Sequence, residues 1–233
     1  MPELQFDTPS GRLRGYLARP LHAGAHPGVV VIQDALGLSD DIKDQADRLA
    51  TAGYLAFAPD LYSGRGIRCV VAALVSSRTG TGQAYTEIAA ARRFLAEQPE
   101  CTGRIGVIGF CMGGGFALLC APSGEYAASS VNYGEVPSDA QARLAGSCPV
   151  VGSFGGRDYG LRGRARRLES ALTQIGVAHD IKEYPHAGHG FLNRFNTGPL
   201  LTPLLQLVGL GHEHEAAEDA WRRILAFFGE HLS

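Results

Sequence analysis

A glycine-flanked turn between a strand and a helix constrains this chain more than any other feature of its sequence. Residues 105–108 form a short apolar run typical of a buried strand, and residues 116–119 are helical in pattern. Between them lies the pentapeptide Gly109-Phe110-Cys111-Met112-Gly113. A strand-to-helix turn this tight crowds the backbone around its central residue, so small residues are required two positions before and after it. Glycine at both positions predicts a nucleophile elbow with Cys111 at its tip.

Short apolar runs alternate with helical patterns along most of the chain. The expected strands are at residues 28–32, 54–58, 105–108, 127–131, 150–154 and 180–184. The expected helices carry apolar stripes, formed by Ile42, Ala46, Leu49 and Ala50; by Ala84, Ile88, Ala91 and Leu95; by Ala165, Leu168, Leu172 and Ile175; and by Ala217, Trp221, Ile224 and Phe228. This alternation is typical of strands joined by crossover helices. We therefore predict a three-layer α/β fold, with a mostly parallel central sheet and helices on both faces.

Length and charge balance narrow the class of protein. The chain has 233 residues, with 21 basic and 23 acidic side chains and a formal net charge of −2. A single domain spanning residues 1–233 fits this length, because α/β domains commonly reach it. A nearly neutral chain without blocks of basic residues gives no electrostatic reason to expect nucleic acid or an anionic membrane as a partner. We expect a small-molecule substrate, and the sequence is silent about oligomeric state.

Neither the start of the chain nor its cysteines suggest export. Acidic residues stand at positions 3 and 7, where a secretory signal needs basic residues and then an apolar core. No stretch reaches the roughly 18 apolar residues of a membrane-spanning helix. The five cysteines are an odd number without a C-x-x-C pair, which argues against a disulfide framework or a zinc site. We expect a cytoplasmic protein in which one cysteine can serve as a free, reactive thiol.

Two later motifs supply the partners that a cysteine nucleophile needs. Asp158 follows the predicted strand at 150–154, at the edge where a loop can project a carboxylate toward the nucleophile. It would accept the Nδ1 proton of a histidine and orient the ring; alternatively, it is a turn aspartate that caps the next helix. His189 has glycine on both sides, which favours it as the base, with His186 as the alternative. The order nucleophile, acid, base is the one that α/β-hydrolases use.

Backbone N–H groups complete the predicted site. The N–H of Met112 directly follows the nucleophile and is one donor toward an oxyanion, and the first loop supplies the second through the N–H of Ala35. Thiolate, imidazole and these donors cover the chemistry of acyl transfer, so we expect neither a cofactor nor a metal. His212 and His214, each followed by a glutamate, suggest a metal site, but no further ligand set accompanies them, and a solvated loop is the simpler interpretation.

With these residues in place, the sequence resembles the dienelactone hydrolase family of α/β-hydrolases, whose elbow carries cysteine instead of serine. Besides the elbow, the matching segments are Gln33-Asp34-Ala35-Leu36-Gly37, Ala58-Pro59-Asp60-Leu61-Tyr62, Tyr133-Gly134, Gly155-Gly156-Arg157-Asp158 and Ala187-Gly188-His189-Gly190-Phe191. The resemblance implies hydrolysis of a small ester or enol-lactone through a thioester acyl-enzyme. It assigns Cys111 as nucleophile, His189 as base and then acid, and Asp158 as the residue that orients His189.

The resemblance also implies which residues surround the triad. Asp34 stands where well-known members have a glutamate that pairs with the cysteine, although aspartate is one methylene shorter. We expect Asp34 to line the substrate site together with Leu36, Tyr133 and Phe191.

Family members that process dienelactones hold a substrate carboxylate with two arginines, one upstream of the elbow and one four residues after the catalytic histidine. Here Asn193 occupies the second position and Arg194 follows it, so Arg194 is a candidate anchor. The upstream candidates are Arg65, Arg68 and Arg78.

Other interpretations stay open at this point. A thioesterase, an acyltransferase or a small peptidase can use the same triad, because neither fold nor nucleophile fixes the leaving group. A non-catalytic redox sensor would only oxidise Cys111. The apolar segment 198–211, broken by proline and glycine, is either a short helix packed on the body or a lid or pocket wall beside the site.

Overall fold

The computed structural model describes residues 3–63, 75–76, 80–194 and 211–233. An eight-stranded sheet has the strand order β1-β2-β4-β3-β5-β6-β7-β8. The strands are β1 (Glu3–Thr8), β2 (Gly11–Ala18), β3 (His26–Ile32), β4 (Leu55–Pro59), β5 (Cys101–Phe110), β6 (Ala128–Asn132), β7 (Val150–Gly155) and β8 (His179–Tyr184). The pairs β1–β2 and β2–β4 are antiparallel, and the other neighbours are parallel. The predicted, mostly parallel sheet is confirmed.

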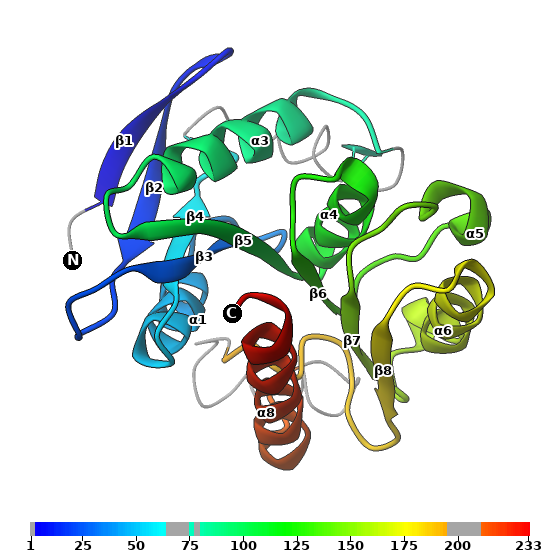
Figure 1. Ribbon diagram of the computed structural model, residues 1–233. Helices are drawn as coiled ribbons and strands as arrows, with labels where there is room; N and C mark the ends of the chain where they lie inside the picture. The colour runs from blue at the N-terminus through cyan, green and yellow to red at the C-terminus, as the bar shows by residue number, and fades with distance from the viewer. Residues whose placement is uncertain (1–2, 64–74, 77–79, 195–210) are drawn as a thin grey trace.

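Helices cover both faces of this sheet (Figure 1). They are α1 (Asp40–Thr51), α3 (Gln83–Ala96), α4 (Met112–Cys120), α5 (Ala140–Arg143), α6 (Arg164–Ile175) and α8 (His214–His231), with 3₁₀ turns η1 (Ala121–Ser123) and η2 (Tyr159–Leu161). Helices α1 and α8 bury apolar side chains on one face, whereas α3, α4 and α6 bury theirs on the other. The three-layer prediction is therefore confirmed.

Helix α1 shows how local sequence sets the bounds of an element. The hydroxyl of Ser39, the N-cap, accepts a hydrogen bond from the N–H of Ile42 at 3.4 Å. The apolar side chains of the predicted stripe are buried against the sheet. Gly53 follows the helix with φ +95°, a conformation that glycine adopts without strain, and turns the chain into β4. The first loop is thereby fixed between β3 and a well-capped helix.

The hairpin of β1 and β2 extends the sheet beyond the predicted elements. Residues on β2 alternate between exposed and buried over its first half, and Leu13 and Leu17 face the core. The charged side chains of Arg12 and Arg14 lie at exposed positions on either side of Leu13. Only one face of a strand in this hairpin packs on the core, so the strand shows a weak apolar pattern in the sequence.

The parallel strands end together at one edge of the sheet, where the predicted chemistry lies. Among the described residues, the residues other than glycine that have a positive backbone angle φ are Ser63 (39°), Cys111 (56°) and Tyr133 (40°). Each lies just beyond the carboxyl end of a strand, namely β4, β5 and β6. Ligand sites of open α/β sheets form outside these strand ends, and backbone strain concentrates at functional loops. We therefore expect the functional site at this edge of the sheet.

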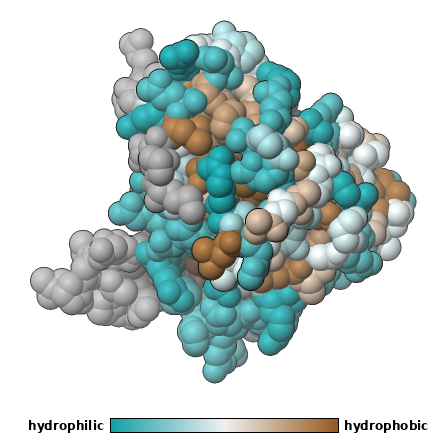
Figure 2. Space-filling view, turned by 60° about the vertical axis from the view of Figure 1, so that its left-hand side comes forward, coloured by the Kyte–Doolittle hydropathy of each residue, from teal (hydrophilic) through white to brown (hydrophobic). Residues whose placement is uncertain are grey.

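Figure 2 shows hydrophilic side chains over much of one face, with hydrophobic ones between them. No helix within the described ranges is long and apolar enough to cross a membrane. Most of the predicted apolar segment 198–211, and the candidate anchors Arg65, Arg68 and Arg78, lie outside the described residues.

Candidate active site

Cys111 stands at the tip of the turn between β5 and α4. Its φ of +56° and ψ of −116° are strained for a residue with a side chain. The close packing of the backbone leaves no room for a side chain at either flanking glycine. A Cβ on Gly109 would lie 1.9 Å from the carbonyl oxygen of Gly113, and a Cβ on Gly113 would lie 2.3 Å from the carbonyl oxygen of Ile32. This packing sets the elbow against the end of β3 and leaves Cys111 partly exposed.

One imidazole ring joins the predicted nucleophile to the predicted acid. His189 lies on the loop after β8, with Nε2 3.1 Å from Sγ of Cys111. Its Nδ1 lies 2.6 Å from Oδ2 of Asp158, on the loop after β7. The side chain of Asp158 is 6% exposed and that of His189 is 26% exposed, so the carboxylate is shielded while the ring can be reached. The structure thus brings together the three side chains that the sequence singled out.

Asp158 has two structural roles at once. While Oδ2 contacts His189, Oδ1 accepts a hydrogen bond from the N–H of Leu161 at 3.2 Å and caps the turn η2. Both interpretations of this aspartate, as a partner of histidine and as a turn cap, describe contacts that the structure contains. The cap fixes the carboxylate, because an oxygen held by the backbone cannot rotate toward solvent.

The electrostatic surroundings of His189 favour its charged form. Burial opposes a charged ring, but the hydrogen bonds to Asp158 and Cys111 outweigh it and raise the pKa of His189 from 6.5 to about 10. At neutral pH the ring accordingly holds a proton beside the sulfur and the carboxylate. Such an imidazolium can give a proton to a leaving group and take it back from water.

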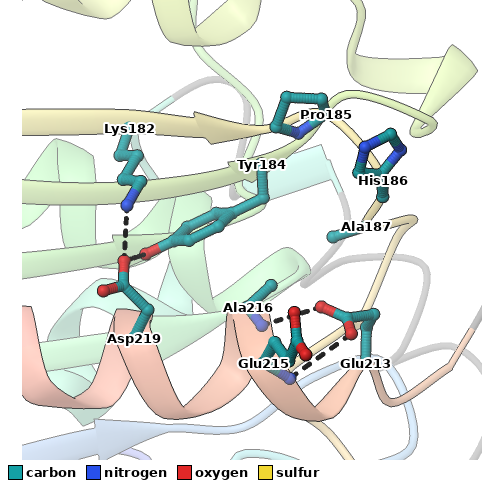
Figure 3. Close-up of a pocket in the computed structure, with 9 residues that line it drawn as sticks. All are labelled: Lys182, Tyr184, Pro185, His186, Ala187, Glu213, Glu215, Ala216 and Asp219. Carbon is teal, nitrogen blue, oxygen red and sulfur yellow. Dashed lines mark hydrogen bonds and ion pairs between the residues drawn. The ribbon is translucent and has the colours of Figure 1, made fainter.

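His186, the alternative base, lies away from Cys111. It is exposed and lines a pocket at the start of α8, together with Pro185 and Glu213 (Figure 3). On the other side of this pocket, Asp219 accepts hydrogen bonds from Lys182 at 2.6 Å and from the hydroxyl of Tyr184 at 2.9 Å (Figure 3). The histidine that contacts the sulfur is His189.

A buried polar network lies behind the His189 ring. The ring of Tyr133 packs edge-on against that of His189, with centroids 5.3 Å apart, and its hydroxyl donates a short hydrogen bond to Oδ1 of Asn193. The amide of Asn193 in turn donates to Oδ2 of Asp41 at 2.5 Å and to Oδ2 of Asp34 at 3.5 Å. Asn193 is 1% exposed. The network ties the histidine loop to the first loop and to the start of α1.

Asp34 is buried beside this network. Its Oδ1 accepts a hydrogen bond from the N–H of Leu36 at 2.7 Å, and Oδ2 faces Asn193. Burial, aided by the nearby charge of Asp41, raises the pKa of Asp34 to about 6, although the hydrogen bond from Leu36 and the charge of His189 oppose the rise. The carboxyl group therefore titrates just below neutral pH.

The other predicted lining residues lie at different depths. Leu36 is 69% exposed, whereas Phe191 is fully buried between the rings of Tyr133 and Tyr184. Phe191 consequently supports Tyr133 from behind. Arg194 is exposed, and its backbone N–H donates to Oδ1 of Asp41 at 2.6 Å.

Sequence reasoning missed two residues at this edge as parts of the site. Asn193 entered only as a departure from an arginine, yet it is the centre of the buried network. Tyr62 entered only as part of a matching segment, yet its hydroxyl lies 3.3 Å from the carbonyl oxygen of Ala35 and 3.7 Å from Sδ of Met112. The sequence does hold a signal for Tyr62: it directly follows β4, whose carboxyl end lies beside that of its parallel neighbour β3, where the first loop begins.

The paired histidines lie apart from this constellation. His212 precedes α8 and His214 begins it, with ring centroids 6.2 Å apart. Within the described ranges, no group of three or more His, Cys, Asp or Glu side chains is placed to hold a metal ion.

The chain is similar in sequence and in fold to known hydrolases along nearly its whole length. The model of the "Dienelactone hydrolase family" matches residues 13–232. The "Putative carboxymethylenebutenolidase" of Methylorubrum extorquens AM1 is 28% identical over 248 residues, covering 98% of this chain and 80% of that protein. The protein of the same name from Synechocystis is 27% identical, covering 95% and 93%. The crystal structure titled as a putative dienelactone hydrolase from Klebsiella pneumoniae superposes with a TM-score of 0.81 at 26% identity, covering 98% of both chains.

Proposed function

Because the chain belongs to the dienelactone hydrolase family of α/β-hydrolases, we propose that it hydrolyses a small ester or enol-lactone with Cys111 as nucleophile. His189 takes the proton of Cys111 as a base and then gives it to the leaving group as an acid, and Asp158 orients the ring. The observation that carries this proposal is the unbroken line of contacts through one ring, from Sγ to Nε2 at 3.1 Å and from Nδ1 to Oδ2 at 2.6 Å. A nucleophile, a base and an orienting group within hydrogen-bond reach are what covalent catalysis requires.

The first half of the reaction forms a thioester. The Cys111 thiolate adds to the carbonyl carbon of the substrate, and the carbonyl electron pair moves onto oxygen. The N–H groups of Met112 and Ala35 would bind this oxyanion. When the carbonyl re-forms, the bond to the leaving oxygen breaks, and that oxygen takes the proton from Nε2 of His189. In a lactone the leaving oxygen stays attached to the acyl group as its own chain.

The second half returns the enzyme to its starting state. A water molecule gives a proton to Nε2 of His189 while its oxygen adds to the thioester carbonyl. Collapse of this second intermediate breaks the carbon–sulfur bond, releases the carboxylic acid and leaves the thiolate beside the protonated ring. Asp158 holds the ring in one orientation throughout, and the residues of the chain supply every group that these steps use.

The test is a substrate panel combined with a matched cysteine control. Aryl esters, thioesters and unsaturated lactones are assayed with the wild type, with Cys111→Ala and with Cys101→Ser. Cys101 is a free cysteine at the opposite end of the same strand, β5. We expect ester or lactone turnover that Cys111→Ala abolishes and Cys101→Ser retains. A preference for thioesters would favour the thioesterase alternative, and turnover that survives in Cys111→Ala would refute the proposed nucleophile.

A further inference from the structure

Tyr62 lies between the two residues whose N–H groups would bind the oxyanion. Its hydroxyl donates a hydrogen bond to the carbonyl oxygen of Ala35 at 3.3 Å and approaches Sδ of Met112 at 3.7 Å. Ala35 belongs to the loop after β3, and Met112 follows Cys111 at the elbow. The phenol therefore bridges the first loop and the elbow.

The first loop is a tight turn in which Tyr62 supplies one of three fixing contacts. The N–H of Gly37 donates to the carbonyl oxygen of Asp34 at 3.2 Å, and the N–H of Leu36 donates to Oδ1 of Asp34 at 2.7 Å. The carbonyl group of Ala35 and its N–H are attached to the same Cα. The Ala35 N–H lies in the same planar peptide group as the Asp34 carbonyl, which the N–H of Gly37 holds. Tyr62 holds the next peptide group through the Ala35 carbonyl. With the peptide groups on both sides of its Cα held, Ala35 keeps its backbone torsions, and its N–H keeps its direction.

The phenol ring is itself held firmly. The N–H of Tyr62 donates to Oδ1 of Asp60 at 3.1 Å, and Asp60 is buried and paired with Arg14 at 2.8 Å. A Cβ added to Gly37 would lie 3.1 Å from Cδ2 of Tyr62, so the ring packs directly on the turn. A donor fixed in advance needs no reorganisation when charge develops beside it.

The hydroxyl keeps its proton over the range in which the enzyme would work. Burial raises the pKa of Tyr62 to about 12, and the nearby charges of Asp34 and Cys111 act in the same direction, although the side-chain amide of Gln33 opposes them. Since His189 titrates at about 10, Tyr62 remains a donor wherever the protonated ring exists.

We propose that Tyr62 is a positioning residue that fixes the Ala35 amide for oxyanion binding, by holding the Ala35 carbonyl and packing against Gly37 and Met112. This inference rests on the proposed function, because it assumes that Cys111 attacks a carbonyl group. It assigns to Tyr62 a role in the transition state and none in forming the thiolate.

Tyr62→Phe tests the inference because it removes only the hydroxyl and keeps the ring. Tyr126→Phe is the matched control: its hydroxyl is buried without a hydrogen-bond partner in the described structure, just before β6 at the opposite edge of the sheet. We expect Tyr62→Phe to lower kcat about tenfold with KM within twofold, which is less than the loss of a whole oxyanion donor. We expect Tyr126→Phe to keep the wild-type kcat.

A second measurement separates oxyanion binding from damage to the nucleophile. Alkylation of Cys111 by iodoacetamide needs the thiolate but forms no oxyanion. A trifluoromethyl ketone, by contrast, adds to the sulfur and leaves a charged oxygen in the oxyanion site. The inference predicts an unchanged alkylation rate in Tyr62→Phe and affinity for the ketone lowered about tenfold, in parallel with kcat.

Each failure has its own signature. If Tyr62→Phe keeps the wild-type kcat and ketone affinity, the inference is wrong while the proposed function stands. If alkylation slows as much as kcat, Tyr62 supports the Cys111–His189 pair and the inference is equally wrong. If the wild type turns over esters without acylating Cys111, the proposed function itself has failed, and the role assigned to Tyr62 fails with it.

Discussion

Asp158 contacts His189 through a single carboxylate oxygen, because its other oxygen accepts the hydrogen bond from Leu161. These two hydrogen bonds hold the carboxylate in a single orientation. The same orientation would apply to asparagine, the amide of the same shape, at position 158. An asparagine that keeps the Leu161 bond with its oxygen must turn its NH₂ group toward Nδ1, which forces the ring proton onto Nε2.

Asp158→Asn should therefore produce a folded but nearly inactive enzyme. We expect kcat to fall about 10²- to 10⁴-fold, because the ring then presents a donor to the sulfur and can no longer accept its proton. The cap on η2 is kept, so the midpoint of thermal unfolding should stay close to that of the wild type. Steady-state kinetics and a thermal melt on the same preparation check both parts. Activity within fivefold of the wild type would show that Asp158 does not orient the base.

Asp34 should make stability depend on pH in one defined window. The pKa of Asp34 is about 6 in the folded protein, and its ordinary value, which applies to the unfolded chain, is 3.8. Between these two pH values the folded state therefore binds more protons than the unfolded state. The free energy of unfolding then falls as pH rises through the window, by up to about 3 kcal/mol from this group. Asp34→Asn cannot titrate and should lose that slope.

Urea unfolding at pH 4.5 and pH 7.5 measures this effect. Relative to the wild type, Asp34→Asn should gain stability between the lower and the higher pH. Asp44→Asn, an exposed aspartate on α1, serves as the control and should follow the wild-type curve. A difference between Asp34→Asn and the wild type that is the same at both pH values would contradict the burial argument.

The hydroxyl of Tyr133 should contribute measurably to stability. Tyr133→Phe leaves Oδ1 of Asn193 buried without its donor, which costs about 1–3 kcal/mol. Tyr126→Phe, whose hydroxyl has no partner within the described residues, should be nearly neutral. Denaturant unfolding of both variants gives the comparison. Equal stability of the two would mean that the Tyr133–Asn193 bond adds nothing to the network.

Even the methyl group of alanine at Gly113 of the elbow should destabilise the fold. Gly113→Ala places a Cβ against backbone at the end of β3, which cannot move away, so we expect a loss of about 3 kcal/mol or more together with activity. Gly229→Ala in α8 meets nothing closer than 4.0 Å and should stabilise the fold by about 0.5–1 kcal/mol. Chemical denaturation distinguishes the two; a tolerated alanine at 113 would refute the packing argument.

The parts of the fold that the sequence predicts are those whose signal is local. Strands such as β3 and β5 are buried on both faces and read as continuous apolar runs, and the helices show clear stripes. The hairpin β1–β2 was missed because charged residues interrupt its apolar positions. Helix α5 was missed because four residues are too few to show a period.

The site follows the same rule. Cys111, Asp158 and His189 could be chosen because each follows a strand in a distinctive short motif. The link from Tyr133 to Asn193 spans 60 positions, and that from Asn193 to Asp34 spans 159. No local pattern encodes contacts of that range, so the network and the placement of Tyr62 emerge only from the tertiary structure. The same holds for Phe191, whose motif put it near the site but could not give its depth.

Rapid-quench mass spectrometry of the protein with an aryl ester tests the central claim most directly. During turnover, the wild type should carry one acyl group, located by peptide mapping on Cys111, and the adduct should form and decay at rates that account for kcat. His189→Ala should slow both its formation and its decay. Steady turnover with no adduct on Cys111, or an adduct on another residue, would contradict the account.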